Sequence, residues 1–209
     1  MNPPENARPD RDRILQVLLQ EYSALKSEQG SRIQFRDNML YTTIGAVGAI
    51  ASVGLGGFNA GAGTVRHAFL IVPWLTAILG WTYVVNDEKI TAIRRYIDKS
   101  LSKRIKELIG SDLKDFPFGW EHFHRRDELR GERKSIQLAI DLWTFVVSGA
   151  GALFAFLVRA LQNPPAGNTL YFDIIAAGAD LLILVFLARQ ILAYWQRAVK
   201  DDPKATKDS

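Results

Sequence analysis

The 209-residue chain contains no cysteine, which excludes disulfide bridges, thiolate catalysis and cysteine-ligated metal centres. It also lacks a glycine-rich phosphate loop, a nucleophile elbow, a zinc-protease signature and a metal box. His122 and His124 are two positions apart, so on a helix they point to different faces, which is poor geometry for a metal. The first 35 residues are polar and charged, so we expect no cleaved signal peptide. These absences predict a non-enzymatic protein without metal or cofactor.

Charge is missing from long stretches of the chain, although the mean hydropathy is close to zero, as in a soluble protein. Residues 39–58, 68–85 and 142–158 hold no charged side chain over 20, 18 and 17 positions. A fourth stretch of 19 residues, 170–188, is interrupted only by Asp173 and Asp180. A helix needs about 20 mainly apolar residues to cross a bilayer. The pattern favours four transmembrane helices over buried core helices of a soluble protein.

Lys and Arg are distributed very unevenly around these stretches. Of the 26 basic residues, 24 lie within 1–38, 87–135 and 189–209, and the connections 59–67 and 158–169 hold one each. Basic residues next to membrane helices stay in the cytoplasm. We therefore expect both termini and the long middle loop to be cytoplasmic. Because topology and contact with anionic headgroups account for the positive charge, we expect no nucleic-acid partner.

The sequence thus predicts an all-α integral membrane protein in five parts. These are a cytoplasmic amphipathic helix (1–38), a transmembrane hairpin (39–86), a cytoplasmic helical module (87–135), a second transmembrane hairpin (136–189), and a cytoplasmic helix and tail (190–209). The two cytoplasmic segments each carry an apolar stripe at helical spacing, which predicts a helical bundle beneath the membrane. The stripes are Leu15, Leu18, Leu19, Tyr22 and Leu25, and Ile90, Ile93, Ile97, Leu101, Ile105 and Leu108.

The second hairpin has a register that brings opposite charges together at both membrane edges. In that register Arg159 lies opposite Asp173 at the outer edge, and Asp141 lies opposite Arg189 at the inner edge. We predict that these four residues form two ion pairs that clamp the hairpin. Each pair is expected to contribute modestly, because groups at the boundary are partly hydrated.

Asp180 falls in the middle of the fourth apolar stretch, where no Lys or Arg of any span lies at its depth. The hairpin register places it beside Gly151 and Ala152, so we expect it to face protein rather than lipid. Its expected hydrogen-bond partners are hydroxyl groups, namely those of Ser148, Ser52, Thr76 or Thr82. Two interpretations stay open. Asp180 lines a polar path with Ser148 and Ser52, or it is a neutral acid that hydrogen bonds between helices.

Small residues and clustered arginines suggest two further contacts. Close helix packing, within the chain or with another copy, is predicted at Gly45, Gly48, Ser52, Gly56, Gly149 and Gly151. We therefore expect a homo-oligomer in the lipid bilayer. Arg94, Arg95, Arg125 and Arg126 are candidate contacts for a phosphate ligand; the alternative is charge that faces solvent or lipid headgroups.

Three segments carry a resemblance: "EYSALKSEQGSRIQFRDNML", "VVNDEKITAIRRYIDKSLSKRI" and "FGWEHFHRRDELRGERKSIQLAIDLWTF". They resemble a group of small bacterial four-span membrane proteins. The layout is similar to that of multi-span membrane effectors of antiphage systems, including those that respond to cyclic nucleotides. The resemblance implies an inner-membrane protein that oligomerises and damages the membrane when a cyclic nucleotide or a cytosolic protein triggers it. The chain departs from that pattern because it has no recognisable cyclic-nucleotide-binding domain.

Three functions are compatible with the sequence. The first is a membrane effector or channel-like protein whose cytoplasmic helices sense a trigger. The second is a membrane anchor or scaffold that recruits a cytosolic partner. The third is a small proton-coupled transporter that uses Asp180. The first and third require ion movement that depends on residue 180, whereas the second does not.

Overall fold

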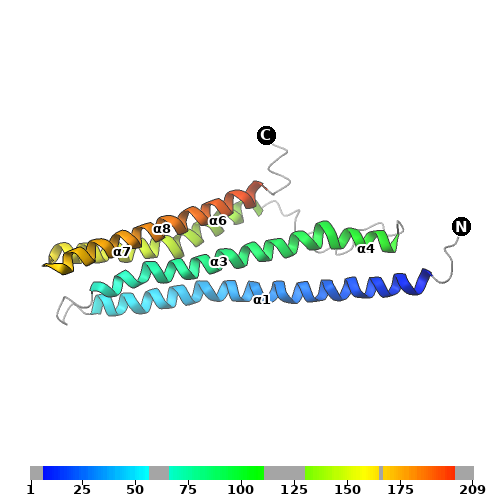
Figure 1. The fold of residues 1–209 in the computed structure, drawn as a ribbon, viewed down its shortest axis with the longest axis horizontal. Coiled ribbons are helices and arrows are strands. Elements are labelled where there is room, and N and C mark those ends of the chain that lie inside the picture. The colour runs from blue at the N-terminus through cyan, green and yellow to red at the C-terminus, as the bar shows by residue number, and fades with distance from the viewer. Residues whose placement is uncertain (1–6, 57–65, 111–129, 165–166, 201–209) are drawn as a thin grey trace. The chain divides into compact units, whose positions relative to one another are not determined.

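The computed structural model describes residues 7–56, 66–110, 130–164 and 167–200, and over these residues it is helical with no strand. The helices are α1 (Ala7–Gly56), the 3-10 turn η2 (Arg66–Leu70), α3 (Ile71–Tyr96), the π-helix η3 (Ile97–Leu101), α4 (Ser102–Ile109), α6 (Arg130–Asp141), the π-helix η5 (Leu142–Val147), α7 (Ser148–Gln162) and α8 (Asn168–Lys200) (Figure 1). The predicted all-α class is confirmed for this part of the chain.

Three helical stretches of the described chain are long and apolar enough to cross a membrane. They are Arg66–Ile109, Ser135–Gln162 and Asn168–Arg197. These stretches contain the second, third and fourth predicted spans. The first predicted span, residues 39–58, falls on the C-terminal part of α1 and stays a prediction.

The chain forms two compact units. Unit 1 comprises residues 1–35 and 86–133, and unit 2 comprises residues 36–85 and 134–209. Helices α1 and α3 each contribute residues to both units. The division separates the strongly charged stretches of the sequence from the apolar ones.

Unit 1 is built on two antiparallel helical segments, one from α1 and one from the end of α3 through α4 (Figure 1). Its buried core consists of Leu18, Ile97, Leu101 and Ile105, with Leu15, Tyr22, Leu25, Ile93, Tyr96 and Leu108 packed around it. These include every residue of the two predicted stripes except Leu19 and Ile90. Leu19 lies outside the core, because 45% of it is exposed. A step of one residue from Leu18 turns the side chain by about 100°, which carries Leu19 off the buried face.

The π-helix η3 explains why the central part of the second stripe stays buried. Ile97, Leu101 and Ile105 follow one another in steps of four residues. In a regular α-helix each such step drifts by about 40° around the axis. The wider turn of η3 accommodates one more residue and returns the stripe to the same face. All three side chains are 2% exposed or less.

Unit 2 has two apolar clusters, both built from several helices. One contains Phe69, Leu70, Val72, Ala152, Leu153, Phe156 and Leu184, with Val47 and Ile50 of α1 against it. The other contains Ala77, Tyr83, Val84, Phe145, Leu187 and Ile191, with Met39 and Leu40 of α1 against it. Helices α7 and α8 form an antiparallel pair that packs on η2 (Figure 1). The two clusters therefore join α1, η2, α3, α7 and α8 into one bundle.

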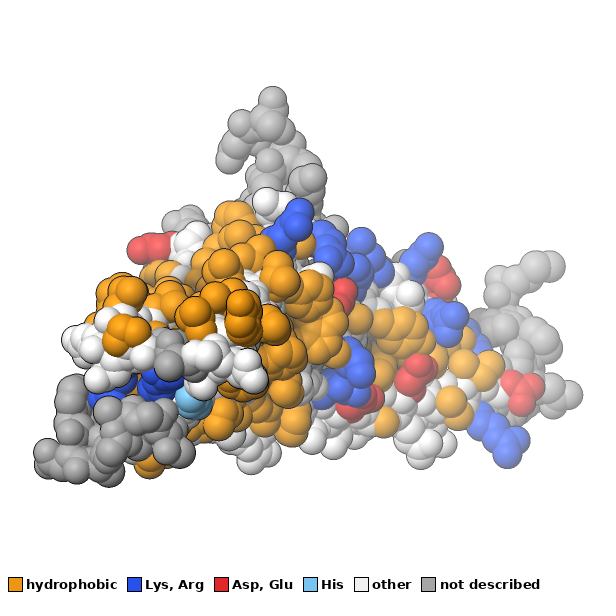
Figure 2. All heavy atoms as spheres, turned by 60° about the vertical axis from the view of Figure 1, so that its left-hand side comes forward, with side chains coloured by type: hydrophobic (Ala, Val, Ile, Leu, Met, Phe, Trp, Pro, Cys, Tyr) orange, Lys and Arg blue, Asp and Glu red, His pale blue; other side chains and the backbone are white. Residues whose placement is uncertain are grey.

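The surface of unit 2 is itself strongly apolar. Its exposed side chains include Ile78 (62%), Phe154 (68%), Ile175 (72%) and Leu182 (71%). Figure 2 shows hydrophobic side chains gathered over much of this unit. A water-soluble monomer rarely exposes apolar areas of this extent, so the surface is suited to contact with lipid. Trp143 and Tyr171 are about 70% exposed near opposite ends of the α7–α8 hairpin, where amphipathic rings meet a membrane interface.

Candidate functional site

Asp180 of α8 is one of the most deeply buried polar residues in unit 2, with 1% of its surface exposed. The indole of Trp74, from α3, approaches the carboxyl group as a hydrogen-bond donor. The Oδ2 atom of Asp180 has no hydrogen-bond partner among the residues that the structure describes. Ionisable groups inside a membrane bundle are costly and mark functional positions by default. Asp180 therefore remains the leading candidate for a functional residue in the spans.

The hydroxyl groups that the sequence offered to Asp180 are used elsewhere. Ser148 donates to the carbonyl of Thr144, Ser52 to that of Gly48, Thr76 to that of Pro73 and Thr82 to that of Ile78. Each bond is made within the donor's own helix, three or four residues back. A hydroxyl has one proton to donate, so none of the four groups donates to Asp180 in this arrangement. The sequence did not predict Trp74 as a partner, because all of the predicted partners were hydroxyl groups.

A second polar cluster joins η2 to α8. The Asp173 Oδ2 atom lies 3.0 Å from Arg66 Nη2, and Asp173 Oδ1 lies 2.9 Å from His67 Nε2. The side chains of Arg66 and Asp173 are 6% and 5% exposed, whereas that of His67 is 32% exposed. Arg66 Nη1 also donates to the backbone carbonyl of Asn163, 2.9 Å away, at the end of α7. The cluster therefore ties together three helical elements through buried charged groups.

Aromatic side chains and another cation complete the surroundings of this cluster. The ring of His67 lies 6.1 Å from that of Phe156 and meets the ring of Phe172 edge-on at 5.9 Å. The guanidinium carbon of Arg159 lies 5.7 Å from the centre of the Phe69 ring. A buried ion pair is costly to break, because the partner left behind is an uncompensated charge. The cluster is thus a firm connection between helices.

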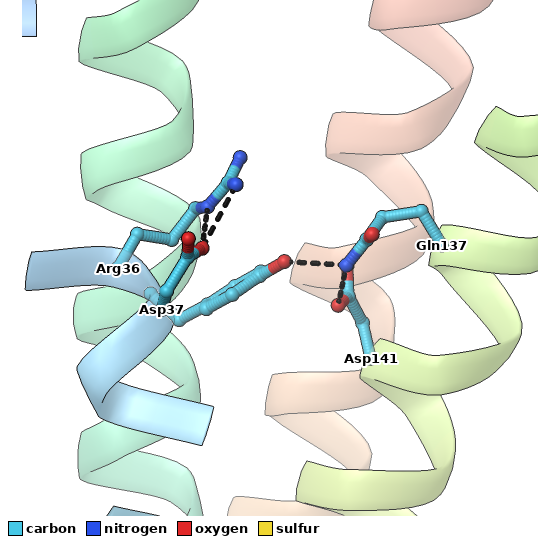
Figure 3. A network of polar contacts seen from close by, with 5 residues as sticks. Arg36, Asp37, Gln137 and Asp141 are labelled. Atoms are coloured by element: carbon cyan, nitrogen blue, oxygen red, sulfur yellow. Dashed lines mark hydrogen bonds and ion pairs between the residues drawn. The ribbon is translucent and has the colours of Figure 1, made fainter. Parts of the chain in front are cut away.

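A third polar group lies between α1, α3 and α6 of unit 2 (Figure 3). Arg36 Nη2 pairs with Asp37 at 2.9 Å, and the Arg36 guanidinium lies 5.9 Å from the centre of the Tyr83 ring. Gln137 Nε2 donates to the Tyr83 hydroxyl at 2.7 Å and to Asp141 Oδ1 at 2.8 Å. This network connects three helices through polar side chains.

No family model, curated protein or solved structure matches the chain.

The ion pairs predicted for the second hairpin differ from those in the structure. The sequence predicted an ion pair between Asp173 and Arg159, whereas in the structure the Asp173 carboxylate contacts Arg66 and His67. Asp141 accepts a hydrogen bond from Gln137 on its own helix. Arg189 is exposed and forms no ion pair with any residue in the described part of the chain. The prediction aligned only the two helices of one hairpin. It therefore did not include Arg66 and His67, which lie in η2.

The predicted packing glycines separate into two groups. A Cβ atom on Gly149 would lie 2.6 Å from Leu184 Cδ2 and 2.9 Å from Thr76 Oγ1, so close packing requires glycine there. Gly45, Gly48 and Gly151 have no such atom within 4 Å. The α1 glycine in close contact is instead Gly54, where a Cβ would lie 2.4–2.9 Å from three atoms of the Phe69 ring. The side-chain surroundings of Gly56 lie outside the described residues.

Unit 1 carries the remaining candidate contacts. Arg94 and Arg95 lie on α3, whereas Arg125 and Arg126 lie outside the described residues, so the predicted phosphate contacts stay a prediction. An open groove of about 650 Å³ runs along α1 in this unit. Its lining consists of Ala24, Ser27, Glu28, Ser31, Arg32, Phe35 and Asn86. Arg32 pairs with Glu28 at 2.6 Å and reaches Asn86 Oδ1 at 3.3 Å.

Proposed function

We propose that the protein is a non-enzymatic effector of the bacterial inner membrane. It crosses the membrane four times, has both termini in the cytoplasm, and self-associates to permeabilise the membrane when unit 1 binds a trigger. The observation that carries the proposal is Asp180, a carboxyl group buried within a bundle of candidate spans with one oxygen unpartnered among the described residues. Rings of acidic side chains in an oligomer select cations. We therefore infer that permeation is cation-selective.

The sharing of helices between the two units supports a coupling between sensing and permeation. Helix α1 and helix α3 belong to both units, without a break between α-helical residues at the boundaries 35/36 and 85/86. A trigger that changes the packing of unit 1 therefore acts on backbone that continues into unit 2. Cyclic nucleotides and a cytosolic protein are the triggers that the resemblance implies.

The direct test is cation flux through liposomes that contain the purified protein. Flux would be measured with and without a panel of cyclic nucleotides, for the wild type and for Asp180→Asn. We expect cation flux with one trigger and a decrease in that flux on the order of tenfold in Asp180→Asn. The amide removes the acidic group that would attract cations inside the membrane. Asp98→Asn makes the same chemical change at a residue of unit 1, outside the uncharged stretches of the sequence, and is expected to leave flux unchanged.

The control for correct insertion uses the absence of cysteine. Single cysteines introduced at Glu107 and at Asn168 are expected to react with a membrane-impermeant reagent from opposite sides of the membrane. Wild-type and Asp180→Asn proteins that insert in this way and conduct equally would exclude a role for Asp180. Correctly inserted protein that never conducts would exclude the pore.

A scaffold that recruits a cytosolic protein is the second candidate, and the groove of unit 1 favours it. Phe35 at this groove is 46% exposed, beside the small side chains of Ala24, Ser27 and Ser31. An exposed apolar side chain over small residues is suited to a partner helix. In this case Asp180→Asn would be silent, and Phe35→Glu would release the partner from membranes that carry the chain.

A further inference from the structure

Helix α8 buries one face in the interior of unit 2. Its buried residues, among those that the structure describes, are Asp173, Asp180, Leu184, Leu187 and Ile191, each at most 4% exposed. They follow one another in steps of seven, four, three and four residues, which is the spacing of a single helix face. Asp180 therefore lies on the inner face of α8, and its carboxyl group depends on other helices for its contacts.

A second repeat pairs this region of α8 with the chain that runs from η2 into α3. Three side-chain contacts join the two, namely His67 with Asp173, Trp74 with Asp180 and Trp81 with Phe186. The contacts recur every six or seven residues along both elements, as between two helices that run in parallel. Seven residues advance a helix by about 10 Å, so the Trp74 contact lies roughly 10 Å further along α8 than the first contact.

Trp74 connects the buried carboxyl group with the surface of unit 2. Trp74 is 47% exposed, whereas Asp180 is 1% exposed. Ile71, Ile78 and Trp81 are also exposed and recur at helical spacing with Trp74, so all four share the outer face of α3. An indole combines a large apolar ring with one N–H donor. Trp74 therefore lies between the apolar surface and Asp180, and it gives its only hydrogen-bond donor to the carboxyl group.

We propose that Trp74 is the gating residue of Asp180, which a cation reaches only after the indole has left the carboxyl group. The inference rests on the proposed function, because it specifies how the same site opens. A carboxylate binds cations through its oxygen atoms, so a donor that occupies one of them competes with the cation. The contact between Trp74 and Asp180 is therefore the closed arrangement, and the trigger must bring about its loss.

Trp81 provides a matched control on the same helix face. It lies seven residues from Trp74 and is 43% exposed. Its ring lies 5.9 Å from that of Phe186, which is uncharged and 49% exposed. Replacing Trp81 removes the same indole from the same surface without uncovering a carboxyl group. A difference between the two positions therefore reports on Asp180 and not on the loss of an exposed tryptophan.

The first measurement is the rate at which a maleimide labels Asp180→Cys in the full chain in detergent, which does not require a pore. The chain has no other cysteine, so the label reports on this position alone. A buried group reacts through local openings, so we expect labelling on the order of tenfold faster with Trp74→Ala than with Trp81→Ala. Equal rates would overturn the proposal, because Trp74 would then not cover residue 180.

A second measurement observes the hydrogen bond itself, through the indole N–H resonances of the full chain in NMR spectra. Trp74→Phe and Trp81→Phe identify the two resonances by their loss. We expect the Trp74 proton to shift upfield in Asp180→Leu, which removes the acceptor at similar size, and the Trp81 proton to stay in place. A Trp74 resonance that Asp180→Leu leaves unchanged would refute the contact. This result decides the question should Trp74→Ala fail to fold.

Cation flux through liposomes then separates the gate from the pore. Trp74→Ala is expected to conduct without a trigger, whereas Trp81→Ala is expected to stay closed. Adding Asp180→Asn to Trp74→Ala should lower the trigger-free flux. Faster labelling in Trp74→Ala, together with liposomes that never conduct, would reject the pore and the gating role and keep Trp74 as the cover of Asp180. A wild type that conducts with a trigger, and a Trp74→Ala variant that still needs it, would keep the pore and reject the gate.

Discussion

Gly149 and Gly151 allow the packing of unit 2 to be tested with a matched pair of substitutions. Both glycines lie on α7, two residues apart, and both were predicted to allow close helix packing. In the structure a Cβ on Gly149 meets Leu184, Thr76 and Pro73 at 2.6, 2.9 and 3.5 Å, whereas a Cβ on Gly151 meets nothing within 4 Å. Alanine at residue 149 should therefore strain the contact of α7 with α3 and α8, and alanine at residue 151 should not.

The expected magnitude follows from two terms. Replacing glycine by alanine within a helix stabilises it by about 0.8–1.0 kcal/mol, and this gain applies equally at both positions. Inserting a methyl group into a packed interior costs about 1–3 kcal/mol, and this cost applies at Gly149 alone. The Leu184 side chain can move, but Thr76 is fully buried and its hydroxyl is held by the Pro73 carbonyl. We expect Gly149→Ala to be less stable than Gly151→Ala by about 1–3 kcal/mol.

The assay is the free energy of unfolding of each purified variant in the same detergent, followed by tryptophan fluorescence. Far-UV circular dichroism of both folded variants controls for a change in helix content. Two variants of equal stability would refute the close approach of α7 to α3 and α8 at Gly149. A less stable Gly151→Ala variant would mean that α7 is rotated about its axis relative to the arrangement described.

Two further predictions concern α1 and unit 1. Gly54→Ala is expected to lower the free energy of unfolding by about 1–3 kcal/mol relative to Gly48→Ala. A Cβ at residue 54 meets the buried Phe69 ring, whereas a Cβ at residue 48 meets nothing within 4 Å. Equal stability of the two variants would mean that α1 is rotated about its axis relative to the arrangement described. The hydrogen bond to Glu21, 2.7 Å long, raises the pKa of the Tyr96 hydroxyl above its usual value. The contribution of this hydrogen bond to the free energy of unfolding is therefore present below about pH 10, and it is lost as the pH rises through the raised pKa of Tyr96. The absorbance difference between wild type and Tyr96→Phe should show a tyrosine that ionises later than the rest, and ionisation together with them would contradict the contact.

Hydropathy and periodicity predicted the all-helical class, three stretches that are long and apolar enough to cross a membrane, and the buried face of unit 1. The span at residues 39–58 and the cytoplasmic placement of unit 1 stay predictions. Long uncharged stretches predicted helices that can cross a membrane, because length and apolar content alone decide whether a helix can do so. The spacing of Leu15, Leu18, Tyr22 and Leu25 likewise predicted the buried face of unit 1, because one helix face recurs every three or four residues. Leu19 shows the limit of that pattern, since a neighbour of a buried residue can be apolar and still lie outside the core.

The tertiary structure decided which polar groups meet. The partners of Asp173 are Arg66 and His67 from a distant part of the chain, and the donor that approaches Asp180 is an indole. Such contacts depend on the rotation and depth of each helix against its neighbours, which neither hydropathy nor a two-helix register specifies. The same reason explains why Gly149 and Gly54 are in close contact while Gly45, Gly48 and Gly151 are not. A small residue permits a close approach, but only the packing of the other helices determines where that approach occurs.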